Sequence, residues 1–143
     1  MKNVIGVILG IVVGMSIMMA LHMASVVVYP LPEGVSLMSQ EPENLEKLKA
    51  WFQDAPTGAW VLATLSHGLG CMAGAAVATL IAKRSLVPAL IIGVFFTVGG
   101  VMNLQQIPHP DWFPYVDLPL YIVLAAIAGL MLRKKGEESA PSA

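Results

Sequence analysis

Four long apolar stretches constrain this chain more than any other feature of its sequence. The first, residues 4–28, carries no charged side chain and is long enough to cross about 30 Å of hydrocarbon as a helix that rises about 1.5 Å per residue. Three further stretches of similar character follow at 57–82, 86–107 and 116–132. The sequence therefore predicts an all-α fold, a transmembrane four-helix bundle that forms one domain over residues 1–135. A disordered polar tail is expected over residues 136–143.

The composition indicates that lipid surrounds these stretches. Hydrophobic residues make up 57% of the chain and charged residues only 12%, about half the charged share of a soluble domain. So much apolar surface cannot be exposed to water, and the lipid bilayer is therefore the expected partner. The net charge of -1 gives no support to nucleic acid as a partner. Cys71 is the only cysteine, which excludes an intrachain disulfide and a cysteine-based metal motif.

Lysine and arginine residues predict how the bundle is oriented. Lys2, the pair Lys83-Arg84 and the run from Arg133 to Lys135 all fall at the same end of the predicted helices. Basic residues that flank membrane spans stay in the cytoplasm. We therefore expect a multi-pass membrane protein with both termini cytoplasmic and with two connecting segments that face outward.

The first outward loop contains the only sizeable polar segment between the spans. The prolines of YPLP at 29–32 end the first helix, because proline cannot donate the hydrogen bond that would continue it. Residues 42–53 then predict a short amphipathic helix, with Pro42 in its first turn and with Leu48 and Trp51 on its apolar face. At about three turns this helix is too short to cross a bilayer. We expect it to lie on the membrane surface or to cap the bundle.

Two rows of small side chains, each spaced by four residues, mark where helices pack closely. Small residues at this spacing let two backbones approach, which is how helices associate in lipid. The rows exceed what a four-helix bundle needs for a single seam. We therefore expect the chain to form a homo-oligomer or to dock on another membrane protein. The first row is Gly6, Gly10 and Gly14, and the second is Ser66, Gly70, Gly74 and Ala78.

An internal similarity joins the second and fourth spans. The segment AAVATLIAKR at 75–84 aligns with AAIAGLMLRK at 125–134, fifty positions later. Two helical hairpins repeated in parallel would produce this similarity. Chance recurrence of alanine-rich helix ends would produce it as well, and both alternatives stay open.

Polar side chains collect in the outward third of the predicted helices. Ionisable groups inside a membrane are costly and are therefore candidates for a functional site. A structural role is the alternative, since a neutral histidine, an asparagine or a glutamine can bond to a neighbouring helix and an aspartate can cap one. The candidates are His67, His22, Asn103, Gln106, Asp117 and Tyr121.

Three ligand chemistries fit residues in this region. Copper(I) would be bound by soft or borderline ligands, although methionine also fills apolar gaps without any metal. A haem could be held between His22 and His67. A proton or ion path could use His67, Asp117, Tyr121 and Asn103. None of these chemistries has a supporting motif, so no cofactor and no metal is expected. The possible copper ligands are Met15, Met19, Met23, His22, His67, Cys71 and Met72.

Enzyme motifs are missing from the sequence. It contains no H-E-x-x-H, no phosphate-binding loop and no C-x-x-C pair. Ser66 and His67 are neighbours on one predicted helix and point about 100° apart, so they do not form a catalytic pair. We therefore expect a non-enzymatic interaction or assembly protein. A channel or transporter for a small cation or proton is the alternative, with His67 and Asp117 as its polar groups.

Several short segments, which together extend over most of the chain up to Phe113, form a recognisable combination. The glycine-spaced opening at Gly6, Gly10 and Gly14 is followed by YPLPEG at 29–34, PTGA at 56–59, IAKR at 81–84, PALIIG at 88–93 and IPHPDWF at 107–113. In this combination the chain resembles a family of small four-span bacterial membrane proteins. The resemblance implies location in a bacterial inner (cytoplasmic) membrane, and it carries no activity.

Overall fold

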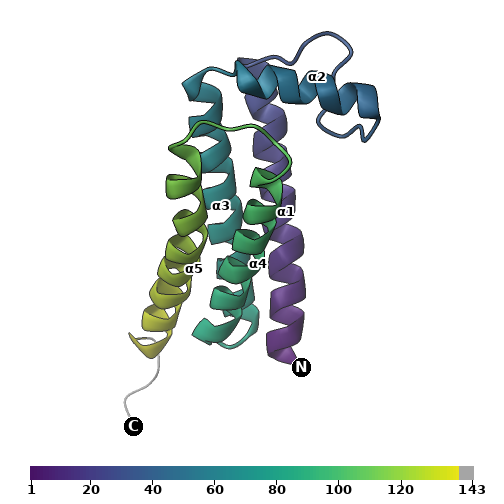
Figure 1. Cartoon of the computed structure of the whole chain (residues 1–143). Helices are drawn as coiled ribbons and strands as arrows, with labels where there is room; N and C mark the ends of the chain where they lie inside the picture. Colours follow the sequence, from purple (N-terminus) through teal and green to yellow (C-terminus); the bar gives the residue numbers. More distant parts are fainter. Residues whose placement is uncertain (139–143) are drawn as a thin grey trace.

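The computed structural model describes the backbone of residues 1–138 and the side chains of residues 1–133. These residues form helices and no strand. Four of the helices are long and apolar enough to cross a membrane, which confirms the predicted all-helical fold with four long apolar helices. They run side by side, and the short α2 lies across one end of them (Figure 1). The helices are α1 (Lys2–Val28), α2 (Pro42–Gln53), α3 (Thr57–Ile81), α4 (Leu86–Leu104) and α5 (Phe113–Glu138).

The helices differ from the predicted spans mainly at their ends. α4 ends at Leu104, and the backbone turns at Gln105 and Gln106, which were expected inside the span. α5 continues to Glu138, so residues 136–138 of the expected disordered tail are helical. The rest of that tail, residues 139–143, lies outside the described residues.

The two ends of the bundle differ in character. We call one the α2 end and the other the basic end, where Lys2, the α3–α4 turn at Lys83 and Arg84, and Arg133 lie (Figure 1).

On α2, Lys47 Nζ donates a hydrogen bond of 2.7 Å to Glu43 Oε1. This hydrogen bond and the positive charge of Lys47 lower the pKa of the exposed Glu43 carboxyl.

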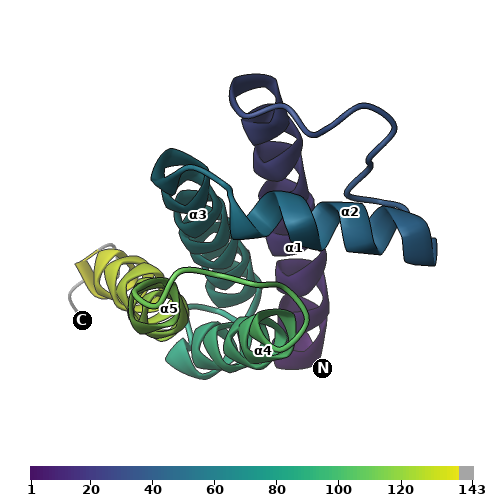
Figure 2. The same ribbon diagram turned by 45° about the horizontal axis from the view of Figure 1, so that its top comes forward.

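α3 is the central helix of the bundle. It packs against α1, α4 and α5, and the view towards the α2 end shows it between α1 and α5 (Figure 2). α3 and α5 run in the same direction, so residues fifty positions apart lie at the same depth: His67 beside Asp117, and Cys71 beside Tyr121. The two segments of the suggested repeat therefore belong to neighbouring parallel helices. The duplication itself stays a prediction.

The seam between α1 and α3 is made by glycine. A Cβ atom placed on Gly10 would lie 2.6 Å from the carbonyl oxygen of Gly74, and one placed on Gly70 would lie 2.8 Å from that of Gly14. Gly6 likewise faces the carbonyl oxygen of Ala78 at 2.8 Å. The two rows of small residues therefore pack against each other within one chain. They serve one seam, and they no longer provide a separate argument for a homo-oligomer.

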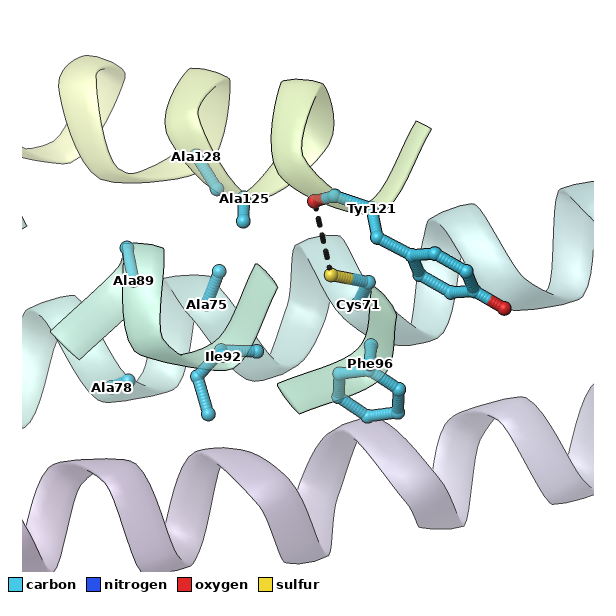
Figure 3. Packing of buried hydrophobic residues seen from close by; sticks show 9 residues of the cluster. All are labelled: Cys71, Ala75, Ala78, Ala89, Ile92, Phe96, Tyr121, Ala125 and Ala128. Atoms are coloured by element: carbon cyan, nitrogen blue, oxygen red, sulfur yellow. Dashed lines mark hydrogen bonds between the residues drawn. The ribbon is translucent and has the colours of Figure 1, made fainter. Parts of the chain in front are cut away.

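The core between the long helices is built mainly from small side chains, with Ile92, Phe96 and Tyr121 as the larger ones (Figure 3). Cys71 is fully buried, and its Sγ donates to the carbonyl oxygen of Tyr121 at 3.3 Å. Thr79 is also fully buried and donates to the carbonyl oxygen of Ala75. The members of the core are Cys71, Ala75, Ala78, Ala89, Ile92, Phe96, Tyr121, Ala125 and Ala128.

Candidate functional site

A cavity of about 330 Å³ lies at the α2 end of the bundle. Side chains from α1, α2 and α3 line it, together with the end of α4 and the start of α5. The lining is mostly apolar and aromatic, and His22, His67 and Asn103 are among its few polar side chains. Pockets of roughly 300–1,000 Å³ with apolar walls and a few convergent polar groups are typical of small-molecule sites.

His67 is held in place by a buried carboxylate from α5. Its Nδ1 lies 2.8 Å from Oδ1 and 3.0 Å from Oδ2 of Asp117, whose side chain is only 1% exposed. The hydroxyl of Tyr121 donates to Oδ2 of the same carboxylate at 3.1 Å, and the Tyr121 ring stacks on the imidazole. The carboxylate oxygens of Asp117 accept, so Nδ1 of His67 is the donor of this hydrogen bond. The second ring nitrogen, Nε2, is left without a bond to Asp117.

His22 on α1 has the same arrangement with a different partner. Its Nδ1 donates to the carbonyl oxygen of Met18 at 2.8 Å, one turn earlier on the same helix. The centres of the His22 and His67 rings lie 5.1 Å apart with 42° between the ring planes. Hydrogen bonds from the described residues reach these rings only at Nδ1. Both side chains line the cavity, and we call these two side chains its floor.

A row of aromatic rings connects the floor to α2. Phe113 lies edge-on to His67 with 6.2 Å between ring centres, and Trp60 lies 4.8 Å from Phe113. Phe52 of α2 continues the row at 5.4 Å from Trp60. These spacings are typical of favourable aromatic pairs. Leu48 and Trp51 of α2 also line the cavity, so α2 covers it with its apolar face.

The structure brings together five of the six predicted polar site residues. His22, His67 and Asn103 line the cavity, while Asp117 and Tyr121 lie behind His67. Gln106 is exposed, and its side-chain amide donates to the carbonyl oxygen of Met102 at 3.3 Å. It is not part of the cavity lining.

The aromatic lining was not foreseen from the sequence. Trp60 lies seven residues before His67, which is two turns along the same face of a helix, and this spacing could have indicated it. The pattern of residues 42–53 predicts an apolar face with Trp51 on it, but it does not predict a cavity beneath that face. Phe113 precedes the fourth predicted span and is the first residue of α5, where only tertiary packing decides what it covers.

The possible copper ligands separate into two groups. Met15 and Met19 line the cavity, and so does Met18, which was not among those considered. Cys71 belongs to the core instead. Met23 and Met72 are not in the cavity lining. Within residues 1–133, histidine, cysteine, aspartate and glutamate side chains form no cluster of three that could hold a metal ion.

A haem does not fit between the two histidines. Their ring centres are 5.1 Å apart, which is ring-to-ring contact, and a macrocycle cannot be inserted between rings in contact. Both rings would have to move apart before each could bind an iron from opposite sides.

The side chains below the floor are packed and mainly apolar. Among the described residues between His67 and the basic end, Cys71 and Thr79 are the fully buried side chains that carry a polar atom. Each is bonded to a backbone carbonyl. The polar groups of the floor therefore have no buried polar continuation towards the basic end.

The serine hydroxyls near the two histidines in the sequence already donate hydrogen bonds to backbone carbonyls. Ser66 donates its hydroxyl to the carbonyl oxygen of Leu62, and Ser25 donates to that of His22. Neither is poised as a nucleophile activated by an imidazole. The geometry therefore supports binding in the cavity more directly than covalent chemistry.

No protein-family model, curated protein or solved structure matches the chain.

Proposed function

We propose that this chain is a non-enzymatic, multi-pass membrane protein that binds a small ligand in the cavity at its α2 end. The observation that carries the proposal is the convergence of the two histidines on one apolar, aromatic cavity. Apolar walls exclude water, and a few fixed polar groups orient the ligand. Asp117 and Tyr121 support the site by fixing the orientation of the His67 ring.

The cavity is proposed to open to the outside of the cell. The basic residues at the opposite end of the bundle favour the cytoplasm for that end and for both termini. α2 would then lie at the outer surface of a bacterial inner membrane, with Trp51 at the depth of the lipid headgroups. The resemblance to small bacterial membrane proteins supports the choice of membrane.

Transport of a small cation or proton is the second candidate. The buried His67 and Asp117 favour it, because ionisable groups inside a membrane mark ion pathways. A path across the bilayer must also pass the packed core between Cys71 and Ala82, where the described side chains offer no series of polar groups. Binding requires no such path, so it ranks first.

Assembly with a second copy of the chain or with another membrane protein stays a prediction. Large apolar side chains such as Ile8, Val12 and Val94 are exposed on the helices, as lipid or a partner protein would require. Binding in the cavity is compatible with either.

Tryptophan fluorescence provides a direct test of binding. Trp51 and Trp60 line the cavity, whereas Trp112 does not. 4-Bromophenol is a suitable probe, because its bromine quenches nearby tryptophans and its hydroxyl can donate to an imidazole nitrogen. In the Trp112→Phe variant, we expect quenching that saturates with probe concentration. In a Trp51→Phe/Trp60→Phe variant, partition of the probe into lipid should give only a gradual, unsaturated decrease.

A His67 variant provides a second comparison in this experiment. Replacing His67 by alanine in the Trp112→Phe background should weaken binding about tenfold, the effect of losing one hydrogen bond of about 1.4 kcal/mol. Unsaturated quenching of the same slope in all variants would contradict the proposed function.

A further inference from the structure

We propose that the floor of the cavity binds a soft monovalent metal ion, copper(I), between Nε2 of His22 and Nε2 of His67, with a methionine thioether as a further ligand. This inference rests on the proposed function, because the ion would enter through the same cavity. It assigns the chemical class of the ligand, which the cavity alone does not.

The hydrogen bonds of the two rings are those of metal-binding histidines. A histidine that ligates a metal through one nitrogen almost always donates its other N–H to a carboxylate or a backbone carbonyl. His67 donates Nδ1–H to Asp117, and His22 donates Nδ1–H to the carbonyl oxygen of Met18. Each bond fixes the tautomer of its ring and leaves the lone pair of Nε2 available.

The separation of the rings suits one shared ion. Imidazole nitrogens bind such ions at about 2.0 Å, which places the ion about 3.2 Å from each ring centre. With ring centres 5.1 Å apart, two rings that both turn Nε2 towards one ion would subtend roughly 105° at it. This angle leaves room for one or two further ligands.

The buried charge of Asp117 favours a monovalent ion. The hydrogen-bond partners of this carboxylate are His67 and Tyr121. A buried carboxylate charge is costly unless a positive charge compensates it. Copper(I) bound by two neutral imidazoles brings one positive charge and makes the site neutral. A divalent ion would leave an excess positive charge in an apolar cavity.

Three methionine side chains line the same cavity as the two histidines. Met15, Met18 and Met19 precede His22 by seven, four and three residues, which places them on one side of α1. Thioethers select copper(I), whereas imidazoles alone would also suit zinc or nickel. Cys71 takes no part, because it is buried in the core with its Sγ bonded to Tyr121.

The test is copper(I) binding to the purified full-length protein under reducing conditions, in competition with the colorimetric chelator bicinchoninate. We expect one copper(I) per chain. The variants His22→Ala and His67→Ala should each weaken binding by at least a hundredfold, and Asp117→Asn by about ten- to a hundredfold, as loss of a supporting hydrogen bond does. His109→Ala is the matched control and should bind as the wild type does, since His109 lies in the connector outside the cavity lining.

Two further measurements keep the result decisive if a histidine variant misfolds. X-ray absorption of the copper-loaded protein should show both nitrogen and sulfur scatterers. The sulfur contribution should disappear in a Met15→Leu/Met18→Leu/Met19→Leu variant, which keeps the apolar volume of the side chains. Failure of the wild type to retain copper(I) against the chelator would overturn the inference, and so would zinc binding of equal affinity. If 4-bromophenol still quenches Trp60 saturably in that case, the proposed function stands and only the metal is wrong.

Discussion

Gly10 and Gly74 bring the backbones of α1 and α3 into direct contact. A Cβ atom on Gly74 would lie 2.5 Å from the carbonyl oxygen of Gly10, and a Cβ atom on Gly10 would lie 2.6 Å from that of Gly74. Both carbonyls are backbone groups, so neither can move aside as the end of a flexible side chain could. The position of α1 against α3, and hence the meeting of His22 with His67, depends on this contact.

The first prediction concerns this seam. Gly74→Ala should lower the free energy of unfolding by about 2–3 kcal/mol, because the added methyl group forces the two backbones apart. Gly99→Ala is the control, since a Cβ atom there meets nothing within 4 Å. Alanine is the better helix former, so this variant should be more stable by up to about 1 kcal/mol. Denaturant unfolding of the protein in detergent micelles measures both, and equal effects would contradict the packing described for Gly74.

The second prediction concerns the buried pair of His67 and Asp117. His67→Leu should cost about 3–5 kcal/mol of unfolding free energy, because it leaves a buried carboxylate without its partner. Asp117→Leu removes that carboxylate, so the double variant should recover most of the loss. Tyr121→Phe should cost only about 1 kcal/mol, since Asp117 keeps its bonds to His67.

A double-mutant cycle in the absence of metal measures the coupling between these two side chains. We expect a coupling free energy above about 1 kcal/mol, as for residues in one hydrogen-bonded network. Strictly additive losses would show that the two side chains do not depend on each other.

The overall fold could be predicted from the sequence because a bilayer leaves few choices. Uncharged stretches of this length must satisfy their backbone groups internally, and a helix does so within one segment. The row of Gly6, Gly10 and Gly14 also identified the side of α1 that packs closely. The sequence did not identify the neighbour, and the structure shows that this row meets the row of Gly70, Gly74 and Ala78 in the same chain.

The sequence predicts how deep in the bundle the candidate site residues lie, but it does not predict how each helix is rotated about its own axis. Counting turns places His22, His67 and Asp117 in the outward third of the bundle. Which of them touch depends on how each helix is rotated about its axis, and that is decided by packing across the whole bundle. Gln106 lies outside the cavity lining, in the turn that follows the end of α4 at Leu104, and hydropathy does not reveal this turn. The aromatic cover from α2 depends on a loop between helices, where periodicity gives no information.

The third prediction concerns Thr64, whose buried hydroxyl has no hydrogen-bond partner among the described residues. Thr64→Val keeps the shape of the side chain and removes the unpaired hydroxyl, so it should raise the free energy of unfolding by about 1 kcal/mol. The matched variant is Thr79→Val, which removes a hydroxyl bonded to the carbonyl oxygen of Ala75 at 2.8 Å. It should lower stability by about 0.5–1 kcal/mol. Thermal unfolding of the two variants in parallel should give shifts of opposite sign, and a loss in both would mean that the Thr64 hydroxyl is satisfied.

The fourth prediction concerns the orientation on which access to the cavity depends. Cys71 is fully buried, so the wild-type chain should react with a membrane-impermeant maleimide neither in intact cells nor in opened membranes. A cysteine at Gln40, which is exposed in the segment before α2, should be labelled in intact spheroplasts, because the α2 end faces outward in the proposed orientation. A cysteine at Asn3, exposed at the basic end, should be labelled only after the membrane is opened. The reverse result would place the α2 end in the cytoplasm. The histidine floor would then receive its ligand from inside the cell, and uptake from outside would be excluded even though the cavity itself is unchanged.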